Sequence, residues 1–188
     1  MNTPEAVFFW RKLDAPGHDS CQFFRRVRGF RLQGVAVFVE GKRICQLRYD
    51  VHADAAFRTT HARVTGFVGK APVDLRIRSR RGAQWELDGK RQPRVRGCID
   101  VDLGFTPATN LLAVRRLALR VGEAADAPAA YLAFPEMDLR VLPQHYRRVS
   151  RAEYDYRAPT FGYRGTLRIS RIGAVVDYPG LFELVRGG

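Results

Sequence analysis

Residues 45–52 read CQLRYDVH, and apolar and polar side chains alternate strictly along this stretch. A period of two is typical of a β-strand that buries one face and exposes the other. The preceding residues 30–39 are a longer apolar stretch, and residues 40–43 (EGKR) supply a glycine that tolerates the positive φ of a tight hairpin turn. The sequence therefore predicts two antiparallel strands joined by a hairpin.

Comparable stretches, separated by turns that contain Gly or Pro, recur along the chain. Residues 123–130 (EAADAPAA) are rich in alanine, but Pro128 interrupts them, and we interpret them as a loop. We expect one all-β domain over residues 1–188, with about a dozen or more strands, because so long a meander closes or nearly closes to remove its edges. This fold is a single large antiparallel β-barrel or a strongly curved sandwich, and a barrel of that width can hold a ligand cavity. Further strands are expected near residues 7–13, 21–27, 73–81, 114–121, 131–134, 138–142, 146–156, 161–170 and 174–178.

The composition is that of a globular protein, with 188 residues of which 46% are hydrophobic. No apolar run approaches the roughly 20 residues of a membrane-spanning helix, and the N-terminal sequence lacks the pattern of a secretory signal, so we expect a cytoplasmic protein. The three cysteines and four histidines form no CxxC or comparable ligand spacing. We therefore expect no disulfide framework, no metal site and no cofactor.

The formal net charge is +13, which raises the question of nucleic acid or anionic lipid as a partner. In residues 73–81 (VDLRIRSRR) the basic side chains occupy the positions opposite the apolar ones, which is the pattern of a solvated face. We interpret the charge as a generic basic surface and do not expect nucleic acid to be the ligand. Binding to nucleic acid would instead require a contiguous arginine face and a steep dependence on salt.

The most distinctive stretch is residues 98–119, CIDVDLGFTPATNLLAVRRLAL. It begins as a strand that places Asp100 and Asp102 on one face, continues through a polar loop, and resumes in a second expected strand. Arg115 and Arg116 are adjacent on that second strand, so one of them would point inward. A buried guanidinium needs a partner, and we expect a structural pair with Asp100 or Asp102 in preference to a ligand anion.

This stretch resembles the signature of the bacterial Putative glycolipid-binding family, formerly a domain of unknown function. In that family an Asp-rich strand leads into a Thr-Pro-x-Thr-Asn loop and then a basic Arg-Arg-Leu segment. The matching residues here are Asp100, Asp102, Thr106, Pro107, Thr109, Asn110, Arg115, Arg116 and Leu117. Other segments that look like the family are Trp85 with Asp88-Gly89, residues 134–135 (FP), 142–146 (LPQHY), 154–156 (YDY) and 175–182 (VVDYPGLF).

The resemblance implies a large antiparallel barrel, similar to periplasmic lipoprotein carriers, with an apolar cavity for acyl chains. Our first hypothesis is a binding protein without catalysis whose partner is a glycolipid or another amphipathic small molecule. Peripheral contact with the inner membrane is compatible with this role, and the sequence does not indicate an oligomeric state. The residues expected to meet the headgroup are Asp102, Thr109, Asn110, Arg115, Arg116, Gln144, Tyr156 and Tyr178.

The alternative hypothesis is an enzyme that acts on a hydrophobic or sugar-bearing small molecule, with Asp100 and Asp102 as acid and base groups. None of the four serines lies in a Gly-x-Ser-x-Gly elbow, so a serine nucleophile is not indicated. This hypothesis requires a carboxylate with a shifted pKa inside a cleft. It would be abandoned if Asp102 proved to be a surface residue paired with arginine.

Overall fold

The computed structural model describes residues 3–80 and 83–187, and within these ranges it contains 17 strands, one α-helix and two 3₁₀-helices. The prediction of an all-β protein is therefore confirmed. None of the helices in these ranges has the length and apolar character needed to span a membrane.

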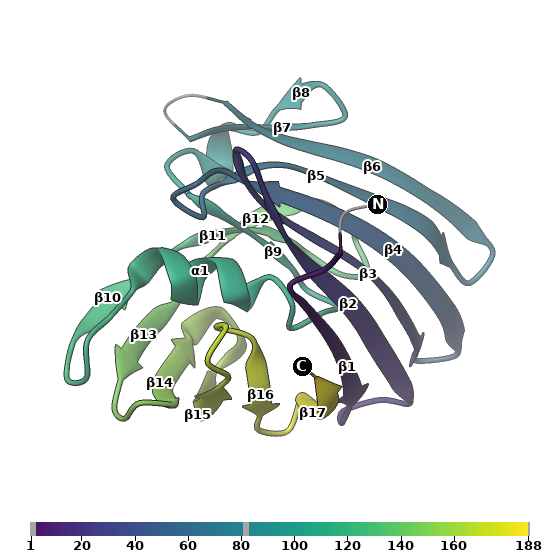
Figure 1. Cartoon of the computed structure of the whole chain (residues 1–188). Coiled ribbons are helices and arrows are strands. Elements are labelled where there is room, and N and C mark those ends of the chain that lie inside the picture. Colours follow the sequence, from purple (N-terminus) through teal and green to yellow (C-terminus); the bar gives the residue numbers. More distant parts are fainter. Residues whose placement is uncertain (1–2, 81–82, 188) are drawn as a thin grey trace.

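The larger of two sheets has 14 antiparallel strands, and its N-terminal strands form a long curved wall (Figure 1). The stretch 45–52 lies in this wall, where its apolar residues are buried and its hairpin pairs Glu40 with Arg43, as predicted. The strands of this half are β1 (Ala6–Lys12), β2 (Gly17–Arg26), β3 (Gly29–Glu40), β4 (Arg43–Ala53), β5 (Thr59–Val68), β6 (Ala71–Arg80), β7 (Gln84–Leu87) and β8 (Lys90–Arg91).

The C-terminal strands continue the same sheet, because β17 pairs with β1. The sheet ends at β8 on one side and at β10 on the other, and these two edge strands do not pair. The expected alternative of a closed barrel is therefore wrong, and the sheet is a strongly curved, open one. The strands of this half are β10 (Ala124–Asp126), β13 (His145–Arg148), β14 (Glu153–Ala158), β15 (Tyr163–Ile169), β16 (Val175–Tyr178) and β17 (Phe182–Gly187).

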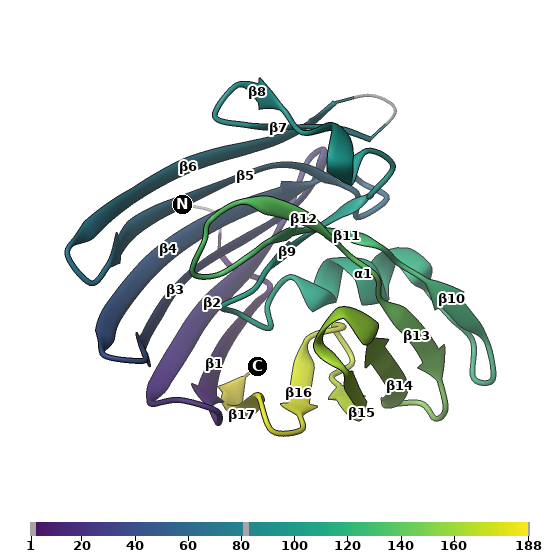
Figure 2. The same ribbon diagram turned by 180° about the vertical axis from the view of Figure 1, so that it is seen from behind.

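A second sheet of three strands, β9 (Asp100–Leu103), β11 (Ala129–Leu132) and β12 (Leu139–Leu142), lies against the concave side of the wall (Figure 2). The interpretation of residues 123–130 as a loop is wrong, since they contain β10 and the start of β11. Side chains fill the space between this sheet and β1–β6, including Trp10, Trp85 and Leu103, which are at most 1% exposed. The expected barrel cavity is thus occupied by a packed apolar core.

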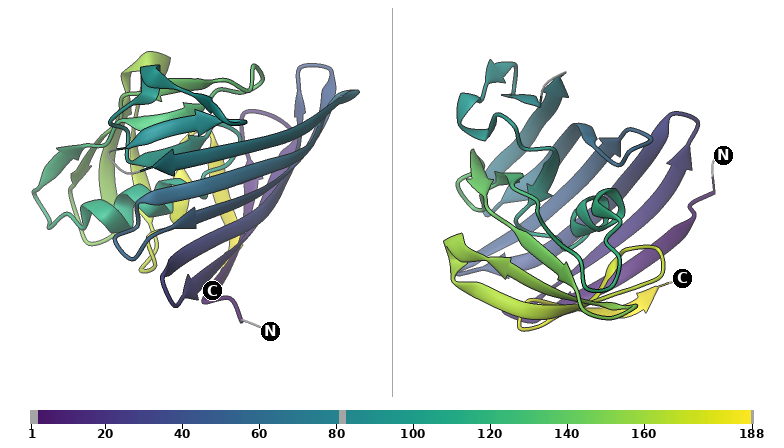
Figure 3. Two further views of the ribbon diagram at one scale, coloured as in Figure 1. Left: turned by 90° about the horizontal axis from the view of Figure 1, so that it is seen from above. Right: turned by 90° about the vertical axis from the view of Figure 1, so that its left-hand side faces the viewer.

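The strand expected over residues 114–121 is instead the α-helix α1 (Asn110–Leu117). Four consecutive residues, 111–114, are buried, and an apolar run of this length does not distinguish a helix from a buried strand. The helix lies inside the curve and packs on the inner face of β13–β16 (Figures 1 and 3). Two 3₁₀-helices, Pro93–Val95 and Pro159–Phe161, complete the described elements.

Candidate functional site: a pocket lined by tyrosines

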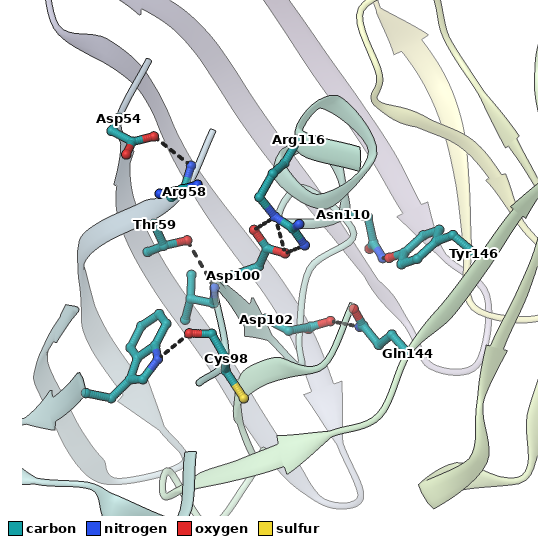
Figure 4. Close-up of polar contacts among 12 residues, drawn as sticks. Asp54, Arg58, Thr59, Cys98, Asp100, Asp102, Asn110, Arg116, Gln144 and Tyr146 are labelled. Atoms are coloured by element: carbon teal, nitrogen blue, oxygen red, sulfur yellow. Dashed lines mark hydrogen bonds and ion pairs between the residues drawn. The ribbon is translucent and has the colours of Figure 1, made fainter. Parts of the chain in front are cut away.

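Asp100 on β9 forms a buried ion pair with Arg116 from α1 (Figure 4). The Arg116 Nη2 atom donates to Asp100 Oδ2 at 2.5 Å, and Nε donates to Oδ1 at 3.0 Å. The Asp100 side chain is 2% exposed. Burial raises the pKa of Asp100, and the hydrogen bonds from Arg116 oppose that shift. The expected structural pairing of one inward arginine is confirmed, although the arginine comes from a helix and not from a strand.

Asp102, two residues further along β9, faces a different environment. Gln144, itself buried, donates from Nε2 to Asp102 Oδ2 at 2.6 Å (Figure 4). The other carboxylate oxygen has no hydrogen-bond partner among the described residues, yet it is not shielded from solvent. Burial raises the pKa of Asp102 to about 6, and the nearby charge of Asp100 adds to that shift. Asp102 therefore presents one free oxygen that can accept hydrogen bonds from a ligand.

That oxygen belongs to a residue that lines a pocket of about 360 Å³. The pocket lies between the end of β9, the start of α1 and the strands β14–β17, where the two apolar clusters of the protein meet. Its volume falls in the range of small-molecule sites. Such sites often lie where separate parts of a structure meet. The lining residues are Asp14, Asp102, Leu103, Gly104, Thr106, Asn110, Tyr131, Leu142, Tyr156, Ala158, Phe161, Tyr163, Tyr178, Leu181 and Phe182.

Six of the fifteen residues that line this pocket are aromatic and four of them are tyrosines, so we call it the tyrosine pocket. The ring of Tyr178 meets the rings of Tyr156 and Tyr163 edge-on, with centroids 5.7 Å and 5.2 Å apart. On the other side Tyr131 and Phe161 form a similar pair at 5.5 Å. A tyrosine offers an apolar face and a polar hydroxyl, so this wall suits a ligand that carries both kinds of surface.

Two groups of buried, hydrogen-bonded side chains lie behind the pocket wall. The first group holds α1 in place. Asn110 at the start of the helix donates from Nδ2 to the Tyr146 hydroxyl at 2.9 Å, and both side chains are buried (Figure 4). Tyr146 in turn packs on Tyr156 with ring centroids 4.8 Å apart. Asn110 therefore supports the pocket more than it exposes polar atoms to it.

The second group centres on Asp19, a carboxyl side chain that is 1% exposed. The Tyr49 hydroxyl donates to it at 3.0 Å, and Thr106, which lines the pocket, also donates to it. No basic side chain in residues 3–80 and 83–187 forms an ion pair with Asp19. Burial without a countercharge raises the pKa of Asp19 to about 7.

The structure divides the eight predicted headgroup residues into three groups. Asp102, Asn110, Tyr156 and Tyr178 line the pocket together, and Gln144 holds Asp102 from behind. Thr109 and Arg116 have structural roles, since the Thr109 hydroxyl accepts from the Leu103 amide at 3.3 Å and Arg116 is paired with Asp100. Arg115 lies in a different pocket, where its guanidinium covers the Phe57 ring at 5.0 Å.

The predicted headgroup residues did not include several members of the pocket wall, among them Thr106, Tyr131, Phe161 and Tyr163. The aromatic ones lie on separate strands or turns, and only the curvature of the sheet brings them together. A surplus of tyrosines in the C-terminal third was the one available signal, and it did not indicate which rings share a site.

Comparisons with known proteins identify similar structures and a matching family. A DUF1089 family protein from Pseudomonas aeruginosa has a similar crystal structure, with a TM-score of 0.78 and 24% identity over 97% of this chain and 94% of that one. A β-barrel-like protein of domain DUF1849 from Brucella abortus is similar at a TM-score of 0.54 and 14% identity, over 97% and 95% of the two chains. No curated protein matches the sequence. The model of the family described as "Putative glycolipid-binding" matches residues 7–184, and the chain belongs to that family.

Proposed function

We propose that the tyrosine pocket binds the sugar headgroup of a glycolipid or a similar amphiphile, without catalysis. The observation that carries this proposal is the combination, in one pocket, of several tyrosine rings with a carboxylate that keeps one oxygen free. Tyrosine rings pack on the apolar faces of sugar rings, and a carboxylate accepts strong hydrogen bonds from hydroxyl groups. The family description points to the same ligand class.

The rim of the pocket offers a surface for the apolar part of such a ligand. Phe161 lines the pocket and is 57% exposed, which is unusual for so large an apolar side chain, and the half-buried Leu181 lines the pocket as well. The packed core behind the pocket leaves the rim as the place where we expect an alkyl chain to leave the site. The ligand would then be held by its headgroup, with its chain directed along Phe161 towards a membrane surface.

The alternative hypothesis requires Asp100 and Asp102 to act as an acid–base pair, and Asp100 is not available for that role. Both Asp100 oxygens are bonded to Arg116, and Asp100 does not line the pocket. The remaining carboxylate of the lining, Asp14, forms an ion pair with Lys12 at 2.7 Å. Asp102 does lie in a pocket with a raised pKa, but no second free carboxylate in the lining faces it, and we therefore favour binding.

Isothermal titration calorimetry with octyl glucoside, below its micelle concentration, tests this proposal. We expect saturable binding to the wild type, and binding about tenfold weaker to Asp102→Asn, because the charged acceptor is lost. Phe161→Ser should weaken octyl glucoside but leave the much weaker binding of free glucose nearly unchanged. The variant removes an exposed ring at the rim and its edge contact with Tyr131, whereas Asp102 and the rings of Tyr156 and Tyr178 stay in place.

Asp155→Asn is the matched control, because Asp155 lies on β14 between Tyr154 and Tyr156 and so points to the opposite face of the strand. This control should bind octyl glucoside like the wild type. Equal affinity for octyl glucoside and octanol, or equal weakening by Asp102→Asn and Asp155→Asn, would refute headgroup recognition in the tyrosine pocket.

A further inference from the structure

A second and larger pocket lies at the far end of α1. It has a volume of about 670 Å³ and shares no lining residue with the tyrosine pocket. Asn110 at the start of α1 lines the tyrosine pocket, whereas Val114 and Arg115 line the second one. The helix thus separates two openings in the hollow of the same curved sheet.

Four arginines from three segments converge on this second pocket, which we call the arginine pocket. Arg115 comes from α1, Arg148 and Arg151 flank the turn between β13 and β14, and Arg171 lies in the turn between β15 and β16. No acidic residue is among those that line it. Four like charges in one concavity repel one another, and a bound anion would relieve that repulsion.

Some arginines elsewhere in the described chain are paired with carboxylates, whereas three arginines of this pocket are not. Ion pairs with Asp or Glu hold Arg11, Arg25, Arg31, Arg63, Arg80, Arg116 and Arg140. Within residues 3–80 and 83–187 no carboxylate lies in ion-pairing distance of Arg115, Arg151 or Arg171, and no hydrogen bond occupies their guanidinium groups. Three sets of donors are therefore free to bind a ligand.

Two of the guanidinium groups are also held in place by aromatic rings. Arg115 lies over Phe57 at 5.0 Å, and Arg148 lies over Tyr154 at 5.6 Å. Arg148 is fixed further, because it donates to the carbonyl oxygens of Leu119 at 2.8 Å and Arg151 at 2.7 Å. Arg148 contributes a fixed positive charge, and Arg115 offers a positioned fork of donors.

The floor of the arginine pocket is apolar. Buried Phe57, Val114, Tyr154 and Ile169 line it beside the arginines. Guanidinium forks match the geometry of phosphate oxygens, and an apolar floor favours a hydrocarbon group next to the phosphate. We propose that the arginine pocket is a second ligand site, which binds a phosphate group attached to an apolar moiety. This inference does not depend on the tyrosine pocket.

Titration calorimetry of the full chain with dioctanoyl phosphatidic acid below its micelle concentration, and separately with inorganic phosphate, tests the proposal. We compare the wild type with the triple variant Arg115→Gln/Arg151→Gln/Arg171→Gln. The matched control is Arg28→Gln/Arg94→Gln/Arg164→Gln, which removes the same charge from three exposed arginines outside the pocket. We expect the pocket variant to bind the phosphatidic acid at least tenfold more weakly, and the control to stay within about threefold of the wild type.

The two probes separate the sources of the phosphate. If phosphatidic acid binds much more tightly than inorganic phosphate, and the pocket variant weakens that binding, the ligand's phosphate belongs to a lipid headgroup. Equal, pocket-dependent binding of both probes supports the phosphate site but removes the apolar requirement. Equal losses in the pocket and control variants, or no binding of either probe, would overturn the proposal. If the triple variant proves less stable than the wild type, the double variant Arg151→Gln/Arg171→Gln replaces it in the comparison. This variant keeps Arg115 on Phe57 and should show the same loss of affinity for phosphatidic acid.

Discussion

Replacement of Arg116 by leucine is expected to lower the free energy of unfolding by about 3–5 kcal/mol, because it leaves the Asp100 carboxylate buried without its partner. Asp100 is 2% exposed and receives its hydrogen bonds from Arg116, so little solvent can replace the lost guanidinium. Urea denaturation at pH 7 measures this change directly.

Arg115→Leu is the matched control, since Arg115 precedes Arg116 on the same helix but is exposed and carries no ion pair among the described residues. Its loss removes the contact with Phe57 and should cost less than about 1 kcal/mol. The double variant Arg116→Leu/Asp100→Asn should recover part of the stability, because the buried charge is then absent. Equal effects of Arg116→Leu and Arg115→Leu would show that the ion pair does not hold α1 on β9.

Asp19 is expected to make the protein less stable as the pH rises from about 4 to about 7. The pKa of Asp19 is about 7 in the folded protein, against 3.8 for an ordinary aspartate. Between these values the folded chain retains a proton that the unfolded chain has released, so stability falls with increasing pH. A difference of this size corresponds to at most about 4 kcal/mol. Asp102 contributes with the same sign up to its pKa of about 6.

Asp19→Asn isolates this contribution, because an amide can accept from Tyr49 and pair with Thr106 without carrying a charge. We expect the variant to be more stable than the wild type at pH 8, and the difference between the two proteins to vanish near pH 4. Other titrating groups, such as Asp102 and the half-buried His61, cancel in this difference. Parallel stability curves for both proteins from pH 4 to pH 8 would contradict a buried, uncompensated carboxyl group at Asp19.

The sequence predicted the strands well where a period of two reports burial on one face. Residues 45–52 and their hairpin are the clearest case, and the strands predicted from such patterns also include β1, β2, β3 and β6. Whether the sheet closes depends on whether β8 meets β10, and residues far apart in the chain decide that. The short strand β10 and the start of β11 pair with β13 and β9, so the strand character of residues 124–130 also depends on distant partners that no local pattern reveals.

The candidate site shows the same division. Asp102, Tyr156 and Tyr178 were predicted to share a ligand site, and the structure places all three around one pocket, whereas their role in binding stays a prediction. The distinction between Arg115 and Arg116 required the helix that the sequence did not predict. On a helix, adjacent residues differ by about 100°, which allows Arg116 to reach Asp100 while Arg115 enters the arginine pocket.

Native mass spectrometry of the protein purified from its own host, followed by solvent extraction, shows whether the tyrosine pocket carries a glycolipid. We expect a discrete adduct with the mass of a sugar-bearing lipid, which the double variant Asp102→Asn/Phe161→Ser loses and Asp155→Asn keeps. An adduct that persists unchanged in the double variant, or a wild-type protein that carries none and fails to bind octyl glucoside, would contradict glycolipid binding in the tyrosine pocket.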